Sequence, residues 1–97
     1  MTLPVPARST LATVTRVAAS ATAVTLAAAN SFRMGLFLYN DSTAEAYVKY
    51  GSGATSTDYT IKMGAGSYWE MPSPINTLLI SCAWASATGA MQVTEES

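Results

Sequence analysis

Apolar and polar residues alternate with a period of two along most of the chain, which is the pattern of half-buried β-strands. The alternation is clear over residues 23–28, 45–50, 58–63, 67–71 and 78–85. Gly, Pro, Asn, Asp and Ser separate these segments at roughly 8–12-residue spacing, which is typical of turns between short strands. The pattern predicts an all-β chain without a helix of useful length.

Residues 11–18 depart from this alternation because their two valines lie on opposite parities, which indicates a β-bulge or an edge strand. Residues 40–43 predict a turn, since Asn, Asp, Ser and Thr side chains hydrogen-bond to their own backbone. A last strand lies around Met91 and Val93. The short connections favour antiparallel neighbours in two stacked sheets. The expected fold is an antiparallel β-sandwich of about eight short strands, either a jelly-roll or an Ig-like sandwich.

Residues 34–39 are apolar on both parities, so we expect a central strand with both faces covered. Leu36 and Leu38 lie on one side of this strand, and Phe37 and Tyr39 lie on the other. Because the second pair needs cover beyond one sheet interface, we expect the chain to self-associate through Phe37 and Tyr39. Loops of the second sheet could supply the same cover instead.

Strand parity also sorts the other aromatic side chains into inward and outward sets. Most of the rings are expected in the core, among them Tyr50, Tyr59, Trp69 and Trp84. The strand at residues 78–85 directs four residues inward: Leu78, Ile80, Cys82 and Trp84. Tyr47 and Tyr68 are predicted to face outward, and both are candidates to contact a partner chain or a glycan.

The first nine residues lack any period and contain Pro4 and Pro6, so we expect residues 1–9 to form an extended arm. Leu3 and Val5 are its apolar anchors, and the stiffness of the prolines lowers the entropy lost when such an arm docks on a neighbouring subunit. An edge strand packed on its own domain is the alternative. Residues 10–97 are then a single β-sandwich domain.

Composition excludes several classes of function. The chain has 97 residues, 11% of them charged, with a net charge of −1, so it supplies no field that would hold a phosphate backbone. Nucleic acid is therefore not an expected partner. No stretch approaches the 18 or so uninterrupted apolar residues of a membrane span, and the first residues do not resemble a signal peptide. We expect a soluble protein made in cytoplasm, with no membrane partner.

The residue types that usually carry chemistry are scarce. Histidine is absent, which removes the commonest general base and the commonest metal ligand. The single cysteine, Cys82, cannot form an internal disulfide, and its inward parity predicts a small core residue. No serine lies in a Gly-x-Ser-x-Gly nucleophile elbow. We expect no catalytic residues, no metal site and no cofactor, and hence no enzyme activity.

Four segments resemble small structural proteins of tailed bacteriophage virions: residues 12–26, 33–42 (RMGLFLYNDS), 47–54 (YVKYGSGA) and 84–90 (WASATGA). The resemblance lies in β-turn-β phrases rather than in a catalytic signature, and it extends over most of residues 12–95. Such proteins are β-sandwiches that decorate or cement capsid shells or sit in head fibres and tails, usually as trimers or other symmetric oligomers. The resemblance implies a location in the virion and a major capsid protein or other virion protein as partner.

Two hypotheses about function follow from these observations. The first is a capsid decoration or cement protein, which the resemblance and the lack of catalytic residues favour. In that case the arm at residues 1–9 would attach the chain to a neighbouring subunit or to a capsid protein. The second is a carbohydrate-binding or receptor-adhesion module of a head fibre or tail, which Tyr47 and Tyr68 favour as outward rings in a framework of low charge.

Overall fold

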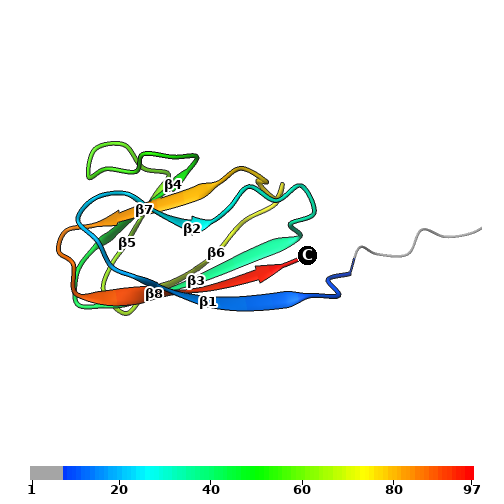
Figure 1. Ribbon diagram of the computed structural model, residues 1–97, viewed down its shortest axis with the longest axis horizontal. Coiled ribbons are helices and arrows are strands. Elements are labelled where there is room, and N and C mark those ends of the chain that lie inside the picture. The colour runs from blue at the N-terminus through cyan, green and yellow to red at the C-terminus, as the bar shows by residue number, and fades with distance from the viewer. Residues whose placement is uncertain (1–7) are drawn as a thin grey trace, which may run out of the picture.

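The computed structural model describes residues 8–97, and this part of the chain consists of eight strands and no helix (Figure 1). The strands are β1 (Ala12–Ala18), β2 (Val24–Ala27), β3 (Gly35–Ser42), β4 (Ala46–Tyr50), β5 (Ile61–Met63), β6 (Tyr68–Glu70), β7 (Ile80–Trp84) and β8 (Gly89–Glu96). Residues 8–97 accordingly contain no helix long and apolar enough to cross a membrane. The prediction of an all-β chain is confirmed.

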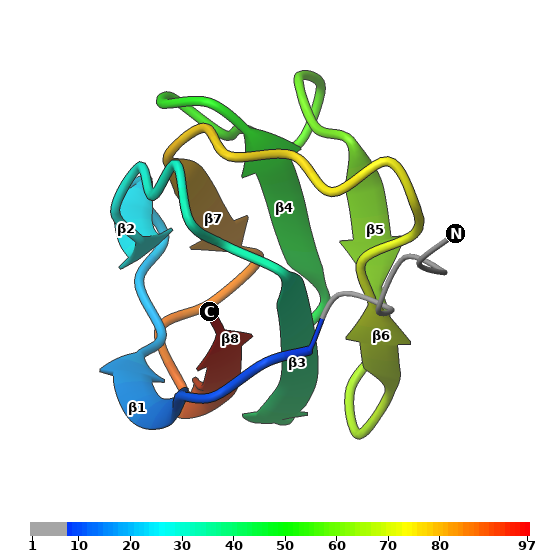
Figure 2. The ribbon, with the colours of Figure 1, turned by 90° about the vertical axis from the view of Figure 1, so that its right-hand side faces the viewer.

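The strands form two four-stranded antiparallel sheets packed face to face (Figure 2). The first sheet has the order β1-β8-β3-β6, and the second sheet has the order β2-β7-β4-β5. Each strand therefore pairs with the strand at the mirrored place in the chain: β1 with β8, β2 with β7, β3 with β6 and β4 with β5. This is one long antiparallel hairpin rolled into a sandwich, and it defines a jelly-roll rather than an Ig-like sandwich.

The core lies between the two sheets and consists of alternate residues of each strand. The first sheet contributes Leu36, Leu38, Met91 and Val93, and the second contributes Ala46, Val48, Ile80, Cys82 and Trp84. Each large aliphatic or aromatic side chain buried in this way stabilises the fold by roughly 1.5–3 kcal/mol. The inward positions predicted for Cys82 and Trp84 are confirmed.

The prediction for the strand at residues 34–39 is correct in its place in the sheet, and one copy of the chain covers one of the two faces. β3 lies inside the first sheet, between β8 and β6. Leu36 and Leu38 are buried, whereas Phe37 and Tyr39 remain 40% and 42% exposed. A sandwich has only two layers, so the outer face of an inner strand still meets solvent within one copy of the chain.

The turn predicted at residues 40–43 is wrong, because β3 continues to Ser42 and the bend follows at residues 43–44. The cause is Asn40, whose fully buried side-chain amide nitrogen donates to the carbonyl oxygens of Ala44, Met63 and Gly64 at 2.9, 3.2 and 3.0 Å. Its side-chain oxygen accepts from Trp84 Nε1 at 3.2 Å. These tertiary hydrogen bonds join the two sheets and outweigh the local preference of Asn for a turn.

Three further corrections concern the second sheet, whose outer face is partly covered by a loop. All five residues of β7 are buried, because residues 51–58 fold back across its outer face. Ser81 Oγ anchors this loop, since it donates to the Gly51 carbonyl at 2.6 Å and accepts from the Ala54 amide at 3.2 Å. Strand β5 is thus shorter than the predicted 58–63, and Tyr59 is exposed rather than inward. Leu78 also precedes its strand and is exposed, contrary to its predicted place in the core.

Strand β1 lies at one edge of the first sheet, which confirms the edge position indicated for residues 11–18. It pairs with β8 in continuous register from Ala12 opposite Glu96 to Ala18 opposite Ala90. Residues 1–7 of the predicted arm, including Leu3 and Val5, lie outside the described residues. The hydroxyl of Ser9 donates to the carbonyl oxygen of Leu11 at 3.1 Å.

Candidate functional site

The outer face of the first sheet carries four large apolar side chains from three different strands. We call this set the apolar face: Val14, Phe37, Tyr39 and Tyr68, with exposed fractions of 63%, 40%, 42% and 68%. The antiparallel register places all four on the same side of the sheet: Tyr39 lies opposite Tyr68, and Thr94 of β8 lies between Val14 and Phe37. Three of the residues singled out from the sequence, Phe37, Tyr39 and Tyr68, therefore share one surface.

Two rings of the apolar face pack against each other within the chain. The rings of Phe37 and Tyr68 are stacked across β3 and β6, with centroids 5.6 Å apart and an angle of 8° between their planes. Stacking of this kind contributes about 0.5–1.5 kcal/mol beyond buried area, so the pair presents a rigid platform. A platform that is ordered in advance loses little entropy when a partner covers it.

A cleft lies beside this platform, between β3, β6 and β8. It has a volume of about 330 Å³ and is lined by Gly35, Leu36, Phe37, Glu70, Thr94 and Glu96. We call it the Glu70–Glu96 cleft. The absence of a side chain at Gly35 keeps it open, because a Cβ atom there would lie 3.1 Å from Glu96 Oε2.

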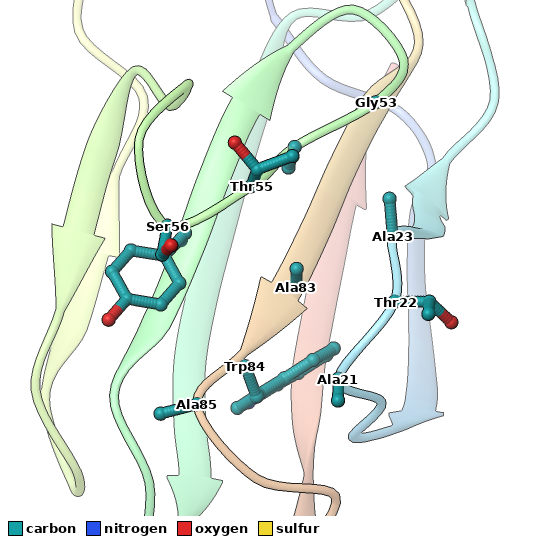
Figure 3. Close-up of a pocket in the computed structure, with 11 residues that line it drawn as sticks. Ala21, Thr22, Ala23, Gly53, Thr55, Ser56, Ala83, Trp84 and Ala85 are labelled. Carbon is teal, nitrogen blue, oxygen red and sulfur yellow. The ribbon is translucent and has the colours of Figure 1, made fainter.

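The second sheet has a separate groove of about 560 Å³ on its outer face (Figure 3). Its walls come from the turn before β2, the fold-back loop after β4 and the end of β7, and small side chains with several hydroxyl groups predominate. The lining residues are Ala21, Thr22, Ala23, Tyr47, Gly53, Ala54, Thr55, Ser56, Ala83, Trp84 and Ala85. We call this the alanine groove.

Among the predicted contact residues within 8–97, Tyr47 is the one that lies at the alanine groove. Its side chain is half-buried, and its ring packs against that of Tyr59 with centroids 5.4 Å apart. The Tyr47 hydroxyl donates to Glu45 Oε1 at 3.1 Å, and this hydrogen bond to a carboxylate raises the pKa of Tyr47 above its ordinary value. The predicted contact residues are therefore divided between the two outer faces of the sandwich.

A further exposed aromatic side chain belongs to a loop at the end of the sandwich where β1 begins and β8 ends (Figure 1). Phe32 is 78% exposed on the loop between β2 and β3, although the backbone around it is fixed. The backbone N–H of Phe32 donates to Asn30 Oδ1 at 2.9 Å, and the backbone N–H of Asn30 donates to the Thr77 carbonyl oxygen at 3.0 Å. The sequence analysis missed Phe32, because a single aromatic residue in a loop has no periodic signal.

Arg33 holds this same end together, and no pattern in the sequence predicts this role. Its side chain is fully buried, and its Nε donates to Glu95 Oε2 at 2.8 Å. Its Nη1 atom donates to the carbonyl oxygens of Asn76 and Leu78, and its Nη2 atom donates to that of Ala28, each at 2.8 Å. The group is a structural clamp between two loops and β8, and all of its contacts are made within the chain.

The chemistry of Cys82 agrees with its place in the core. Burial raises the pKa of the Cys82 thiol to about 12, so the thiol stays protonated and weakly nucleophilic near neutral pH. Within residues 8–97 no three His, Cys, Asp or Glu side chains gather closely enough to hold a metal ion.

Comparisons with known proteins identify no relative. No protein-family model, curated protein or solved structure matches the chain.

Proposed function

We propose that this chain is a structural protein of a virus particle, one that decorates or cements the capsid shell through protein–protein contacts. In this proposal the chain has no catalytic activity and needs no cofactor. It is made in the host cytoplasm and resides in the virion, where its partner is the major capsid protein or another virion protein. Neither nucleic acid nor membrane is among its partners.

The observation that carries the proposal is the apolar face. Large apolar side chains that adjoin one another on the surface of a small chain mark a site of contact with another protein. Aromatic residues are enriched at such interfaces, and a few of them usually supply most of the binding free energy. Two further supports are analogies: the jelly-roll is used by viral capsid domains as well as lectins, and the sequence phrases resemble phage structural proteins.

Binding to particles tests the proposal. Particles of the virus that encodes this chain, produced from a genome lacking the gene, are mixed with purified protein and sedimented. The wild-type chain should sediment with them, and the Phe37→Ser/Tyr68→Ser double variant should bind at least tenfold more weakly, which is about 1.4 kcal/mol. Tyr59→Ser removes an exposed ring from the second sheet and should bind as wild type. Equal binding by all three proteins, or no binding by any, would refute the proposal.

The apolar face also supports self-association, with a trimer as the expected state. Sedimentation equilibrium of the wild-type chain and of Phe37→Ser shows whether this face binds another copy of the chain or only a virion protein. We expect Phe37→Ser to shift the wild-type oligomer towards monomer. A wild-type chain that stays monomeric at high concentration would leave the virion protein as the partner of this face and contradict the trimer.

The alanine groove favours a second candidate function, a carbohydrate-binding or receptor-adhesion module. The lining of the groove combines the ring of Tyr47 with the side chains of Thr22, Thr55 and Ser56, and sugars are bound by aromatic surface together with hydrogen-bonding groups. A glycan array decides between the candidates. Binding that Tyr47→Ala abolishes and Phe37→Ser/Tyr68→Ser leaves unchanged would support this second candidate.

A further inference from the structure

Two of the six carboxylate side chains have no basic partner within the described residues. Four of the six acidic residues lie within 4 Å of a basic side chain: Asp41 with Arg16, Glu95 with Arg33, Asp58 with Lys49 and Glu45 with Lys62. Among the described residues, Glu70 and Glu96 form no ion pair. Both of them line the same cleft on the first sheet.

The sheet register sets these two carboxylates on either side of β3. Glu70 lies on β6 opposite Phe37, and Glu96 lies on β8 opposite Gly35. The Glu96 carboxylate covers the bare backbone of Gly35, and the ring of Phe37 and the side chain of Thr94 complete the walls. The cleft thus combines negative charge, an aromatic ring and a hydroxyl group in about 330 Å³, which is room for one cationic side chain with its methylene stem.

We propose that the Glu70–Glu96 cleft binds an arginine side chain of the virion protein, different from this chain, that docks on the apolar face. This inference rests on the proposed function and names the chemistry of its partner. A guanidinium group satisfies two carboxylates with fixed N–H donors, and its flat face can lie against an aromatic ring. Its alkyl stem would continue the apolar contact from Phe37 and Tyr68. Lysine offers the charge without the planar donors and binds more weakly.

Charge complementarity is the reason for choosing a basic partner over an apolar one. Two like charges beside one cleft repel each other, and a cation between them removes that repulsion and forms charge-assisted hydrogen bonds. An interface of this kind forms faster and more tightly at low salt, because the attraction between the partners is screened by ions.

The test is a nuclear magnetic resonance titration of the full ¹⁵N-labelled chain with the blocked tripeptide acetyl-Gly-Arg-Gly-amide. The same tripeptide with citrulline, which keeps the shape of arginine without its charge, is the ligand control. We expect the arginine peptide to shift the amide signals of Gly35, Phe37, Glu70, Thr94 and Glu96 and the citrulline peptide to bind at least tenfold more weakly.

Matched variants separate the cleft from the net charge of the protein. Glu70→Gln/Glu96→Gln should weaken arginine binding at least tenfold. Glu45→Gln/Asp58→Asn changes the net charge by the same amount on the second sheet and should leave binding within twofold. Gly35→Ala narrows the cleft without changing its charge and should weaken binding severalfold. Equal loss in the two double variants, or equal binding of the two peptides, would overturn the proposal.

Sedimentation with particles distinguishes this inference from the function on which it rests. If Phe37→Ser/Tyr68→Ser releases the chain from particles and Glu70→Gln/Glu96→Gln does not, the proposed function holds and the arginine site is wrong. If the wild-type chain does not bind particles at all, the proposed function itself fails, whatever the peptide titration shows. Loss of self-association in Arg8→Gln would assign the cleft to a second copy of this chain and overturn the inference of a different partner.

Discussion

Replacing Arg33 with methionine should destabilise the protein severely, although the residue contacts no proposed partner. Methionine fills a similar volume but donates no hydrogen bond. The substitution leaves Glu95 without its cation and the carbonyl oxygens of Ala28, Asn76 and Leu78 without their donor. Breaking a buried, hydrogen-bonded ion pair costs about 3–5 kcal/mol. Since domains of this size are stable by about 5–15 kcal/mol, the loss is a large part of the total.

The corresponding change in melting temperature can be worked from the length of the chain. An unfolding entropy of about 2.1 cal/mol/K per residue gives about 0.2 kcal/mol/K for 97 residues. A loss of 3–5 kcal/mol then lowers Tm by about 15–25 °C. Thermal unfolding followed by circular dichroism measures this shift, and urea unfolding gives the free energy independently.

Arg16→Met is the matched control. Arg16 forms an ion pair with Asp41 at 2.7 Å, which is close to the 2.8 Å between Arg33 and Glu95. The side chains of Arg16 and Asp41, however, are both about half exposed. Exposed pairs contribute about 0–1 kcal/mol, so Tm should fall by no more than about 5 °C. If the two methionine variants lost similar stability, burial would not be what makes the Arg33 clamp strong. Should Arg33→Met fail to fold, Arg33→Lys, which keeps the charge but not all of the donors, should still lose more than Arg16→Met.

Three further predictions concern single positions. Gly89→Ala should destabilise the fold by more than about 2 kcal/mol, because Gly89 has φ +92° and a Cβ atom there would lie 2.5 Å from a backbone oxygen. Gly51→Ala, at φ +108° in open space, should cost about 1 kcal/mol. Similar losses of stability for the two variants in urea unfolding would contradict this. Burial raises the pKa of Cys82 to about 12, so the stability contributed by its protonated thiol is complete below about pH 9 and is lost as the pH rises towards 12. Cys82→Val should remove that part of the alkaline decline, and a thiol reagent should modify Cys82 in the folded chain only as fast as the chain opens; rapid modification would refute its burial. Asn40→Ala should cost about 2–4 kcal/mol, since it leaves Trp84 Nε1 without its side-chain acceptor and removes one hydrogen bond from each of three carbonyl oxygens. An unchanged urea midpoint would show that water replaces the amide.

Period-two alternation predicts much of the core of this protein. It placed Leu36, Leu38, Cys82 and Trp84 correctly because each lies on an inner face that the other sheet covers. It also predicted two stacked antiparallel sheets. It left open the choice between jelly-roll and Ig-like topology, because the strand order depends on pairings between distant segments that leave no mark in the local pattern.

The errors share a physical cause, which is that tertiary contacts override local preference. Asn40 is a turn former by propensity, yet it lies in a strand because five hydrogen-bonding groups of other residues meet at its amide. Tyr59 and Leu78 have the correct parity for the core but lie beyond the ends of β5 and β7. Of the apolar face, Phe37, Tyr39 and Tyr68 could be singled out from the sequence, while their meeting with Val14 required the register of β1 and β8.

The mirrored pairing of the strands has a consequence for how the chain acquires its structure. β8 is the strand that joins β1 to β3, so the first sheet cannot close until residues 89–96 have left the ribosome. Until then, β1 and β3 have no common neighbour, and their apolar residues are exposed to solvent. Folds dominated by such distant pairings form on the millisecond to second scale, and the partly made chain is prone to aggregate during this interval.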